Sequence, residues 1–414
     1  MVGRQWEGCA ATIGAMPRCD FDCTSCYLPR DANRAKPLPL EALFAQLERI
    51  RRHFGPWGNV QITDGEVTLR DADELVALLK HAAELQLIPM VMTHGETFLR
   101  DPALLRRLVI EGGLREVSFH VDTTQRGGRG LRAHRVERER ELDPVRDACA
   151  NLVRELRRET GIELRVAATV TVESHNLDQL DEIVRWTLAN SDVMRILSFQ
   201  PSAQVGRTRP DGVKGVDELW RVVERGLGRE VGTGNLWFGH PECSRVVMGC
   251  VWKANGAPPR FAPWRDVEDE ASEAFALDAL QRWGGLSFRA DTRSIAAARA
   301  LGLVAGAPWI ALRSLGYLRR WLRRRLDISI AGAGLSLLRR RAALRPLAIV
   351  SHHFMDAHEL ETPLGAERCD ACVFRVPIDG ELVSMCRVNA GQDRERLYGV
   401  PRQAPPVTQH ARTS

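Results

Sequence analysis

Apolar residues follow two alternating patterns between residues 10 and 205. Short apolar runs, typical of buried strands, alternate with segments in which apolar residues return every three or four positions, as in helices. The apolar runs that predict strands are 10–16, 59–63, 88–93, 116–121, 164–172 and 193–199. Strands that alternate with helices form βα units and a parallel sheet. We therefore expect an α/β fold, a partial (β/α)6 TIM-type barrel.

Polar side chains follow each of the six predicted strands. The C-terminal ends of the strands of a parallel barrel open on one face, where reactive residues collect. The residues at these ends are Cys19, Cys23 and Cys26, then Asp64-Gly65-Glu66, Thr93-His94-Gly95, His120-Val121-Asp122, Thr169-Val170-Thr171 and Gln200-Pro201-Ser202. Polar groups at all six ends predict a single site at the barrel mouth.

The first of these ends carries three cysteines, Cys19, Cys23 and Cys26, on one short loop. A closed metal site requires four ligands, so three thiolates leave one position open. Three thiolates can hold a [4Fe–4S] cluster whose fourth iron accepts an added ligand. The alternatives are a structural zinc site completed by a distant His or Cys, and buried thiols that bind no metal.

The CxxxCxxC loop after the first predicted strand resembles that of the radical S-adenosylmethionine (radical SAM) superfamily. One residue departs from the usual pattern, because Ser25 stands where an aromatic residue often precedes the last cysteine, and the aromatic residue is Tyr27. The resemblance implies an enzyme with a [4Fe–4S] cluster on the three cysteines. It also implies reductive cleavage of SAM to a 5′-deoxyadenosyl radical, with a reductant such as flavodoxin or ferredoxin as partner.

The same resemblance implies a SAM-binding segment after the second strand. Asp64-Gly65-Glu66 occupies the place of the superfamily's Gly-Gly-Glu segment, which binds the methionine ammonium. Glycine allows close approach of the backbone, and a carboxylate can accept charge-assisted hydrogen bonds from an ammonium. The alternative is an acidic turn that caps a helix. By location alone, the further candidates for SAM binding are His120, Asp122, Thr169 and Gln200.

A second group of cysteines lies beyond the predicted barrel. Cys369, Cys372 and Cys386 flank two apolar runs joined by Asp379-Gly380, which is typical of a β-hairpin turn. We expect these three thiols to hold an auxiliary [4Fe–4S] cluster together with Cys243 or Cys250. A four-thiolate zinc site is the alternative.

The C-terminal segment from Ser351-His352-His353-Phe354-Met355-Asp356 to Cys386 and Asn389 is similar to the closing segment of one radical SAM subgroup. That subgroup contains tetraether lipid synthase and related cobalamin-independent methylases; Ser384-Met385 stands where Pro-Phe is usual. The resemblance implies C–C coupling or methylation at an unactivated carbon of a hydrophobic substrate, such as a lipid. The alternatives are a methylase or maturase of a small metabolite or peptide, and a non-catalytic, zinc-stabilised binding protein.

Positive charge is concentrated between Arg313 and Arg345, where ten arginines accompany one acid, Asp327. The residues expected on one helical face of this segment are Leu315, Leu318, Leu322 and Leu326. A basic amphipathic helix can pack on its own protein, lie on an anionic membrane surface or bind nucleic acid. Few aromatic residues are available for base stacking, so nucleic acid is the least expected partner.

Composition and length complete the expectations. The 414 residues carry a net charge of +5, and the clustered spacing of the ten cysteines is typical of metal ligands in a reducing compartment. We expect a cytoplasmic protein, peripheral at the inner membrane surface if the basic segment binds there. The expected domains are a barrel at 1–210, a helical Arg-rich region at 211–345, an auxiliary iron–sulfur domain at 346–400 and a disordered tail at 401–414.

Overall fold

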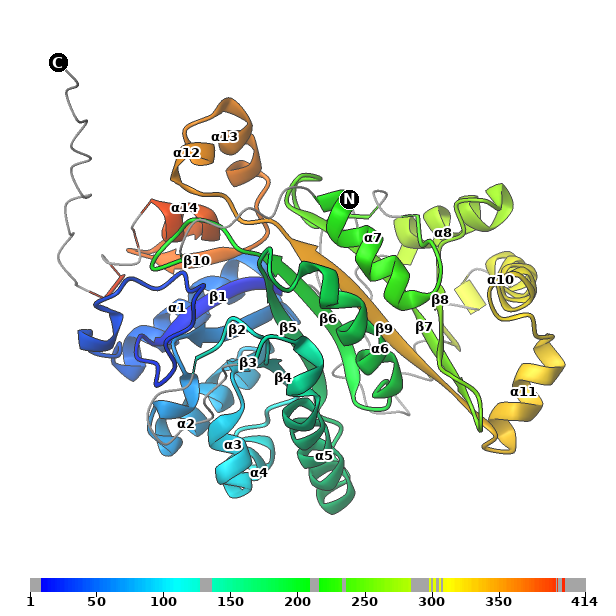
Figure 1. Cartoon of the computed structure of the whole chain (residues 1–414), viewed down its shortest axis with the longest axis horizontal. Helices are drawn as coiled ribbons and strands as arrows, with labels where there is room; N and C mark the ends of the chain where they lie inside the picture. The colour runs from blue at the N-terminus through cyan, green and yellow to red at the C-terminus, as the bar shows by residue number, and fades with distance from the viewer. Residues whose placement is uncertain are drawn as a thin grey trace.

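One sheet of eleven strands runs through the computed structural model, in the order β11-β10-β1-β2-β3-β4-β5-β6-β9-β7-β8 (Figure 1). The structure describes residues 9–126, 136–208, 216–232, 236–283, 298, 301–302, 305–306, 308–391, 393 and 397–398. The predicted disordered tail lies outside these residues.

The six predicted barrel strands are confirmed. They are β1 (Cys9–Met16), β2 (Asn59–Asp64), β3 (Ile88–Thr93), β4 (Glu116–His120), β5 (Arg165–Val172) and β6 (Met194–Pro201). Each pairs in parallel with the next. The predicted α/β fold with a partial barrel is therefore correct, and the C-terminal ends of these strands open on one face.

Helices follow the barrel strands and cover the outer side of the sheet (Figure 1). They are α1 (Leu40–Phe54), α2 (Ala72–Glu84), α3 (Glu96–Arg100), α4 (Pro102–Ile110), α5 (Asp143–Thr160) and α6 (Leu180–Ala189), with short helical turns η1 (Ala32–Arg34), η2 (Val67–Leu69), η3 (Glu139–Leu142) and η4 (Leu177–Gln179). Alternate residues of β1, such as Ile13, pack with Leu43 and Leu47 of α1 in the main core. The alternation leaves the opposite face of each strand for the barrel interior.

The sheet continues beyond β6 through three strands that the sequence pattern did not predict. They are β9 (Ala342–His352), parallel to β6, and the antiparallel strands β7 (Ser244–Ala254) and β8 (Arg260–Pro263). The region expected to be helical thus contains β7 and β8 as well as α7 (Val216–Leu227) and α8 (Glu270–Trp283). Residue 345, an expected domain boundary, falls inside β9.

The predicted C-terminal hairpin is confirmed. Strands β10 (Arg375–Ile378) and β11 (Glu381–Ser384) are antiparallel, and Asp379 and Gly380 have φ values of 49° and 82°, as a tight hairpin turn requires. Strand β10 also pairs with β1. Because of this pairing, three short helices lie at the side of the barrel: α12 (Ala357–Leu360), α13 (Pro363–Asp370) and α14 (Met385–Ala390).

The Arg-rich segment forms α10 (Pro308–Trp321), the π-helical turn η5 (Leu322–Leu326) and α11 (Ile330–Leu338). Leu322 and Leu326 are buried, whereas Leu315 and Leu318 are exposed, so the predicted single apolar face is wrong. The switch from an α-helix to a π-helical turn changes the angle between successive residues. The described residues contain no helix that is long and apolar enough to cross a membrane.

Two arginines of η5 fix this segment to the rest of the protein. Arg324 Nε and Arg325 Nη2 lie 2.8 Å and 2.6 Å from the two carboxylate oxygens of Asp266, which is buried. Packing on its own protein, one of the expected alternatives, therefore accounts for part of the positive charge.

We predict that Asp266→Asn lowers the free energy of unfolding by about 3 kcal/mol, because it leaves the partly buried Arg325 without its carboxylate. Asp217→Asn is the matched control, since the exposed Asp217 also pairs with an arginine, Arg245, at 2.5 Å, and such pairs contribute at most about 1 kcal/mol. Chemical denaturation measures both. Equal losses in the two variants would contradict the structural importance of the Asp266 pair.

Candidate active site

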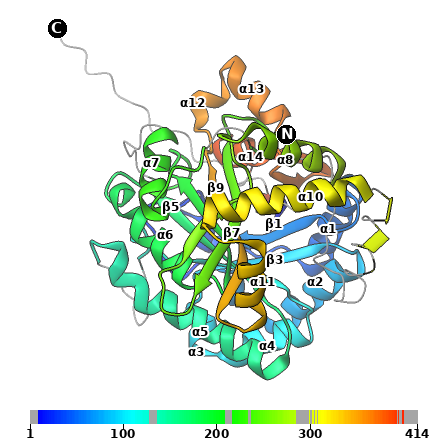
Figure 2. The ribbon, with the colours of Figure 1, turned by 90° about the vertical axis from the view of Figure 1, so that its right-hand side faces the viewer.

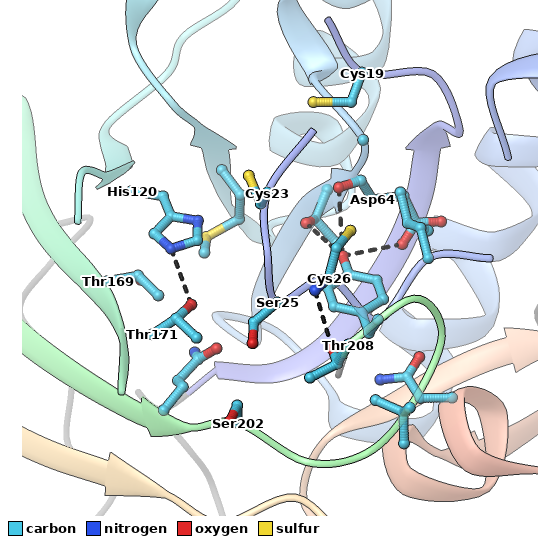
Figure 3. Close-up of a pocket in the computed structure, with 18 of the residues that line it drawn as sticks. Cys19, Cys23, Ser25, Cys26, Asp64, His120, Thr169, Thr171, Ser202 and Thr208 are labelled. Atoms are coloured by element: carbon cyan, nitrogen blue, oxygen red, sulfur yellow. Dashed lines mark hydrogen bonds between the residues drawn. The ribbon is translucent and has the colours of Figure 1, made fainter. Parts of the chain in front are cut away.

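Cys19, Cys23 and Cys26 line one pocket at the mouth of the barrel (Figure 3). Their loop follows β1 and is tied to the ends of other strands. The backbone N–H of Thr24 donates to the carbonyl of Thr124 after β4 at 2.8 Å, and that of Cys26 donates to Thr208 Oγ1 after β6 at 3.0 Å. The loop therefore takes its shape from the barrel as well as from its own residues.

The environment of these thiols suits a metal cluster. Burial raises the pKa of Cys19 to about 12, and burial together with the neighbouring thiols raises the pKa of Cys23. Without a cation Cys19 and Cys23 stay protonated, whereas bound iron would stabilise them as thiolates. The three residues thus fit the expected [4Fe–4S] cluster, because they are three thiols that line the same pocket.

His94 is the described residue best placed to complete a zinc site, because donor atoms of Cys19, Asp20 and His94 lie within 4.8 Å of one another. Both ring nitrogens of His94 are engaged, however. Nε2 lies 2.8 Å from Asp20 Oδ1, and Nδ1 accepts the Glu96 N–H at 3.1 Å. The ring also stacks on Phe21, with 4.0 Å between the centroids. These contacts give His94 a role in shaping the loop rather than in metal ligation.

The Asp64-Gly65-Glu66 segment connects the end of β2 to the cysteine loop. A side chain on Gly65 would meet the carbonyl oxygen of Arg18 at 2.1 Å, so the glycine is required by the backbone of that loop. The Gly65 N–H donates to the Met16 carbonyl at 2.6 Å. Asp64 lines the pocket, and its carboxylate accepts a hydrogen bond from Tyr398.

Glu66 is fully buried and already has several donors. It accepts hydrogen bonds from Thr68 Oγ1 at 2.6 Å, Thr93 Oγ1 at 2.7 Å, and the backbone N–H groups of Thr68 and His94 at 3.1 Å and 2.9 Å. Its bond to the Thr68 N–H caps η2, the capping role that was the alternative for this segment. The protein therefore uses most of the hydrogen-bonding capacity of this carboxylate.

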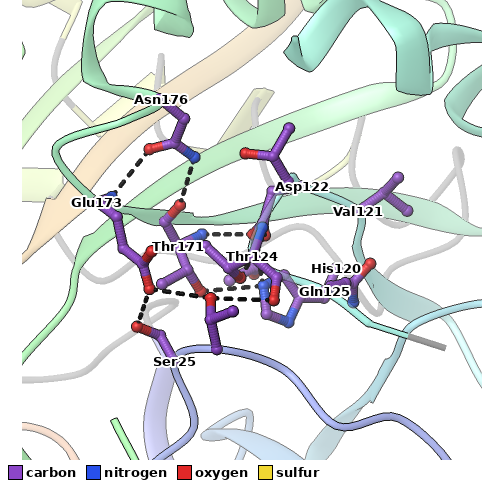
Figure 4. A network of polar contacts seen from close by, with 12 residues as sticks. Ser25, His120, Val121, Asp122, Thr124, Gln125, Thr171, Glu173 and Asn176 are labelled. Carbon is purple, nitrogen blue, oxygen red and sulfur yellow. Dashed lines mark hydrogen bonds and ion pairs between the residues drawn. The ribbon is translucent and has the colours of Figure 1, made fainter. Parts of the chain in front are cut away.

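A buried carboxylate holds the residues at the ends of β4 and β5 together (Figure 4). Asp122 Oδ2 lies 2.7 Å from His120 Nε2 and accepts the Thr171 N–H at 2.7 Å, while Oδ1 accepts the Thr124 hydroxyl at 2.6 Å. Burial alone would raise the pKa of Asp122, but His120 and these hydrogen bonds lower it to about 2.

The candidates for SAM binding are thus not equivalent. His120, Thr169 and Gln200 line the pocket with the cysteines. Asp122 is fully buried and does not line it; its contacts orient His120 and the end of β5.

Two charged residues of the site, Glu173 and Arg207, were not predicted. Glu173, immediately after β5, accepts hydrogen bonds from the Ser25 and Thr24 hydroxyls (Figure 4). Arg207, after β6, lines the pocket beside Cys26. Both lie only a few residues beyond a predicted strand, so a longer search past each strand end would have included them.

A second group of thiols gathers beside the C-terminal hairpin. Cys243, Cys372 and Cys386 line one small pocket, and Cys369 packs against Cys386. Burial raises the pKa of Cys386 to about 12 and that of Cys372 to about 11. Cys250 lies elsewhere, where its sulfur accepts the Trp264 Nε1–H at 3.2 Å. The structure thus places Cys243, and not Cys250, with the other three.

Three apolar side chains separate the two groups of thiols. Phe354, Phe374 and Met385 line the pocket of the barrel mouth and also the pocket of the second group. The two phenyl rings lie edge to face, with centroids 6.2 Å apart. We refer to Phe354, Phe374 and Met385 as the apolar wall.

Comparison with known proteins finds a family match for the barrel. Residues 13–187 match the model of the radical SAM superfamily. The barrel is a radical SAM domain. Enzymes of this superfamily use a [4Fe–4S] cluster and SAM, which agrees with the cofactors expected from the cysteine loop. The non-catalytic zinc protein considered from the sequence is set aside.

Two curated proteins are similar to about half of the chain. The 7,8-dihydro-6-hydroxymethylpterin dimethyltransferase of Methanocaldococcus jannaschii is 25% identical over 222 residues, which cover 50% of this chain and 41% of that protein. The GTP 3′,8-cyclase 1 of Pseudomonas aeruginosa is 26% identical over 229 residues, 51% of this chain and 60% of that protein. The chain thus spans less than two thirds of either relative.

Two solved structures match about half of the chain at low similarity. Streptococcus suis SuiB bound to S-adenosylmethionine is 18% identical with a TM-score of 0.38, over 52% of this chain and 46% of that one. Native anSMEcpe with bound AdoMet is 13% identical with a TM-score of 0.38, over 54% of this chain and 63% of that one.

If the second group of thiols holds the expected auxiliary cluster, Cys243→Ser should reduce the iron and sulfide content of the reconstituted protein by about half, because that cluster would lose one of four ligands. Cys250→Ser is the matched control and should keep the content of the unaltered protein. Colorimetric iron and sulfide assays on anaerobic protein measure both. The reverse pattern, or no loss in either variant, would contradict the assignment of Cys243.

Proposed function

We propose that the enzyme modifies an unactivated carbon of a substrate that binds in the barrel mouth against the apolar wall. The observation that carries this proposal is the position of the wall, between the three barrel cysteines and the second group of thiols. When bound, the cluster and SAM supply a 5′-deoxyadenosyl radical that removes a hydrogen atom from carbon. Apolar side chains on the substrate side exclude water from such a radical.

Within this proposal, Cys19, Cys23 and Cys26 hold the cluster and leave one iron for SAM. Both Asp64 and Glu66 line the pocket, and the methionine ammonium binds Asp64 rather than Glu66 because protein donors already occupy the Glu66 carboxylate. His120, Thr169 and Gln200 face the same pocket and supply polar contacts for the rest of SAM. Asp122 contributes by orienting His120.

An auxiliary [4Fe–4S] cluster on Cys243, Cys369, Cys372 and Cys386 is part of the same proposal. The pairing of β10 with β1 fixes the second group of thiols beside the barrel. The substrate then lies between two iron–sulfur centres, with the apolar wall in contact with both pockets.

A hydrophobic substrate, such as a lipid, fits the apolar wall and the resemblance of the C-terminal segment. The Arg-rich segment does not contribute to this argument, because α10 and α11 lie at the end of β9 away from the pocket (Figure 1). Methylation of a small heterocycle is the second candidate. It is favoured by the methyltransferase relative, which is named for a pterin, and by the two phenyl rings available for stacking.

Anaerobically reconstituted protein should release 5′-deoxyadenosine from SAM in the presence of a strong reductant. Cys23→Ser should abolish the release, whereas Cys149→Ser, at a buried thiol that lines neither pocket, should retain it. Chromatography of the nucleoside products measures the rate. Absence of release from the unaltered, iron-loaded protein would contradict the proposed function.

The same assay separates the two substrate classes. Stimulation by a lipid extract, with formation of a new carbon–carbon bond in a lipid or addition of a methyl group to it, supports a lipid substrate. Stimulation by the aqueous small-molecule fraction, without effect of lipids, supports the second and contradicts a lipid substrate.

We further propose that the Arg-rich segment contacts an anionic membrane surface. Helices α10 and α11 lie at the same end of the molecule in both views (Figures 1 and 2). The large apolar residues exposed on them are Trp309, Leu312, Leu315, Leu318, Ile330, Leu335, Leu337 and Leu338. These eight residues are half of the exposed large apolar residues in the described part of the chain. Such a concentration is typical of an interaction surface.

The positive charge around these helices indicates an anionic partner. The exposed arginines for which the described residues provide no ion pair are Arg319, Arg323, Arg339, Arg340, Arg341 and Arg345. The unpaired arginines can bind the anionic headgroups of a bilayer, and the exposed leucines beside them can insert among its acyl chains.

The protein should therefore sediment with vesicles of phosphatidylglycerol and phosphatidylcholine and not with pure phosphatidylcholine vesicles. Leu312→Glu combined with Leu338→Glu should reduce this binding at least about tenfold, since both side chains are more than two-thirds exposed. Ile110→Glu combined with Leu364→Glu, at exposed apolar positions outside the segment, is the matched control. Equal binding by the two double variants, or a concentration-dependent dimer in place of vesicle binding, would contradict the proposal.

A further inference from the structure

The loop after β6 packs tightly on the cysteine loop. Gly206 has a φ of +57°, and a side chain there would lie 2.3 Å from the carbonyl oxygen of Tyr27. On either side of the contact, the Arg207 N–H donates to the Cys26 carbonyl at 3.0 Å and Thr208 Oγ1 accepts the Cys26 N–H at 3.0 Å. These contacts fix the backbone of Arg207 against the last cysteine of the motif.

The side chain of Arg207 is held in the same place. It is 13% exposed, its Nη1 lies 3.5 Å from Asp22 Oδ1, and its Nη2 donates to the Phe21 carbonyl at 3.4 Å. Its buried Nε has no hydrogen-bond partner among the described residues. Burial by itself would lower the pKa of Arg207, but Cys26, Asp22 and Cys23 raise it. A permanent positive charge therefore stands beside two of the three barrel thiols.

We propose that Arg207 raises the reduction potential of the cluster on Cys19, Cys23 and Cys26, so that a flavodoxin- or ferredoxin-type reductant can reduce it. The inference rests on the proposed function, since it requires that cluster. Reduction transfers one electron from the reductant to the cluster and adds one negative charge. A nearby buried cation stabilises the more negative state, and a donor to sulfur acts in the same direction.

The second group of thiols offers an internal comparison. Arg368 Nε donates to Cys243 Sγ at 3.4 Å, and Nη2 donates to the His353 carbonyl at 2.8 Å. Arg368 is buried, as is most of the Arg207 side chain. Each group of thiols thus has an adjacent arginine, Arg207 or Arg368, and a variant of either one should affect mainly the adjacent cluster.

The test is a redox titration of reconstituted protein, in which the electron paramagnetic resonance (EPR) signal of the barrel cluster reports how much of it is reduced. Arg207→Gln should shift the midpoint potential of this cluster to more negative values, and Arg207→Lys, which keeps the charge, should shift it less. Arg368→Gln should leave it unchanged. Asp22→Asn should shift it to more positive values, because Asp22 is exposed and partly neutralises Arg207.

An unchanged midpoint in iron-loaded Arg207→Gln protein would overturn the inference. If Arg207→Gln protein does not take up iron, an unchanged midpoint potential in Asp22→Asn protein would overturn the inference instead. An equal shift in Arg207→Gln and Arg368→Gln would also overturn it, because the effect would not be local. Failure of the unaltered protein to load a cluster that can be reduced would instead contradict the proposed function.

Discussion

The close contact between the end of β2 and the cysteine loop is the constraint on which the site depends. Gly65 lies against the backbone of Met16 and Arg18, where any side chain would collide with a carbonyl oxygen. The loops after β4 and β6 hold the same cysteine loop through Thr124 and Thr208. Three strand ends thereby determine where the thiols lie, and the parallel barrel supplies those ends on one face.

Buried polar groups complete this arrangement. Glu66 and Asp122 are both fully buried, and both have several donors from neighbouring strand ends. A buried carboxylate is costly unless it is hydrogen-bonded, so each one specifies a single arrangement of the loops around it. The residues that face the pocket are positioned by this shell, which leaves Asp64, His120 and Arg207 to act on the bound groups.

The sequence was sufficient for the barrel and for the position of its site, because both depend on local pattern. Apolar runs and the residues just after them located all six strands and the thiol loop. The pattern could not assign the direction of each polar side chain, and Asp122 lies inside the protein although His120 lines the pocket. Strand β9 was missed because it pairs with β6 and β7, which lie far from it in the chain.

The choice between Cys243 and Cys250 illustrates the same limit. Both cysteines stand close together in the sequence, and neither has a local pattern that favours it. The pairing of β7 with β9 separates them, because Ser244 pairs with His352 next to the second group of thiols, whereas Cys250 pairs with Pro346 further along the strand. Register between distant strands, which no local pattern encodes, therefore decides which cysteine lies with the other three.

The central claim is that three barrel thiols leave one iron open for SAM. The most direct measurement is the EPR spectrum of the reduced protein with and without SAM, in a variant whose Cys243, Cys369, Cys372 and Cys386 are replaced by serine. The account predicts the signal of one [4Fe–4S] cluster, with g values that change when SAM is added. A cluster signal that SAM does not alter, or a protein that binds zinc in place of iron, would contradict it.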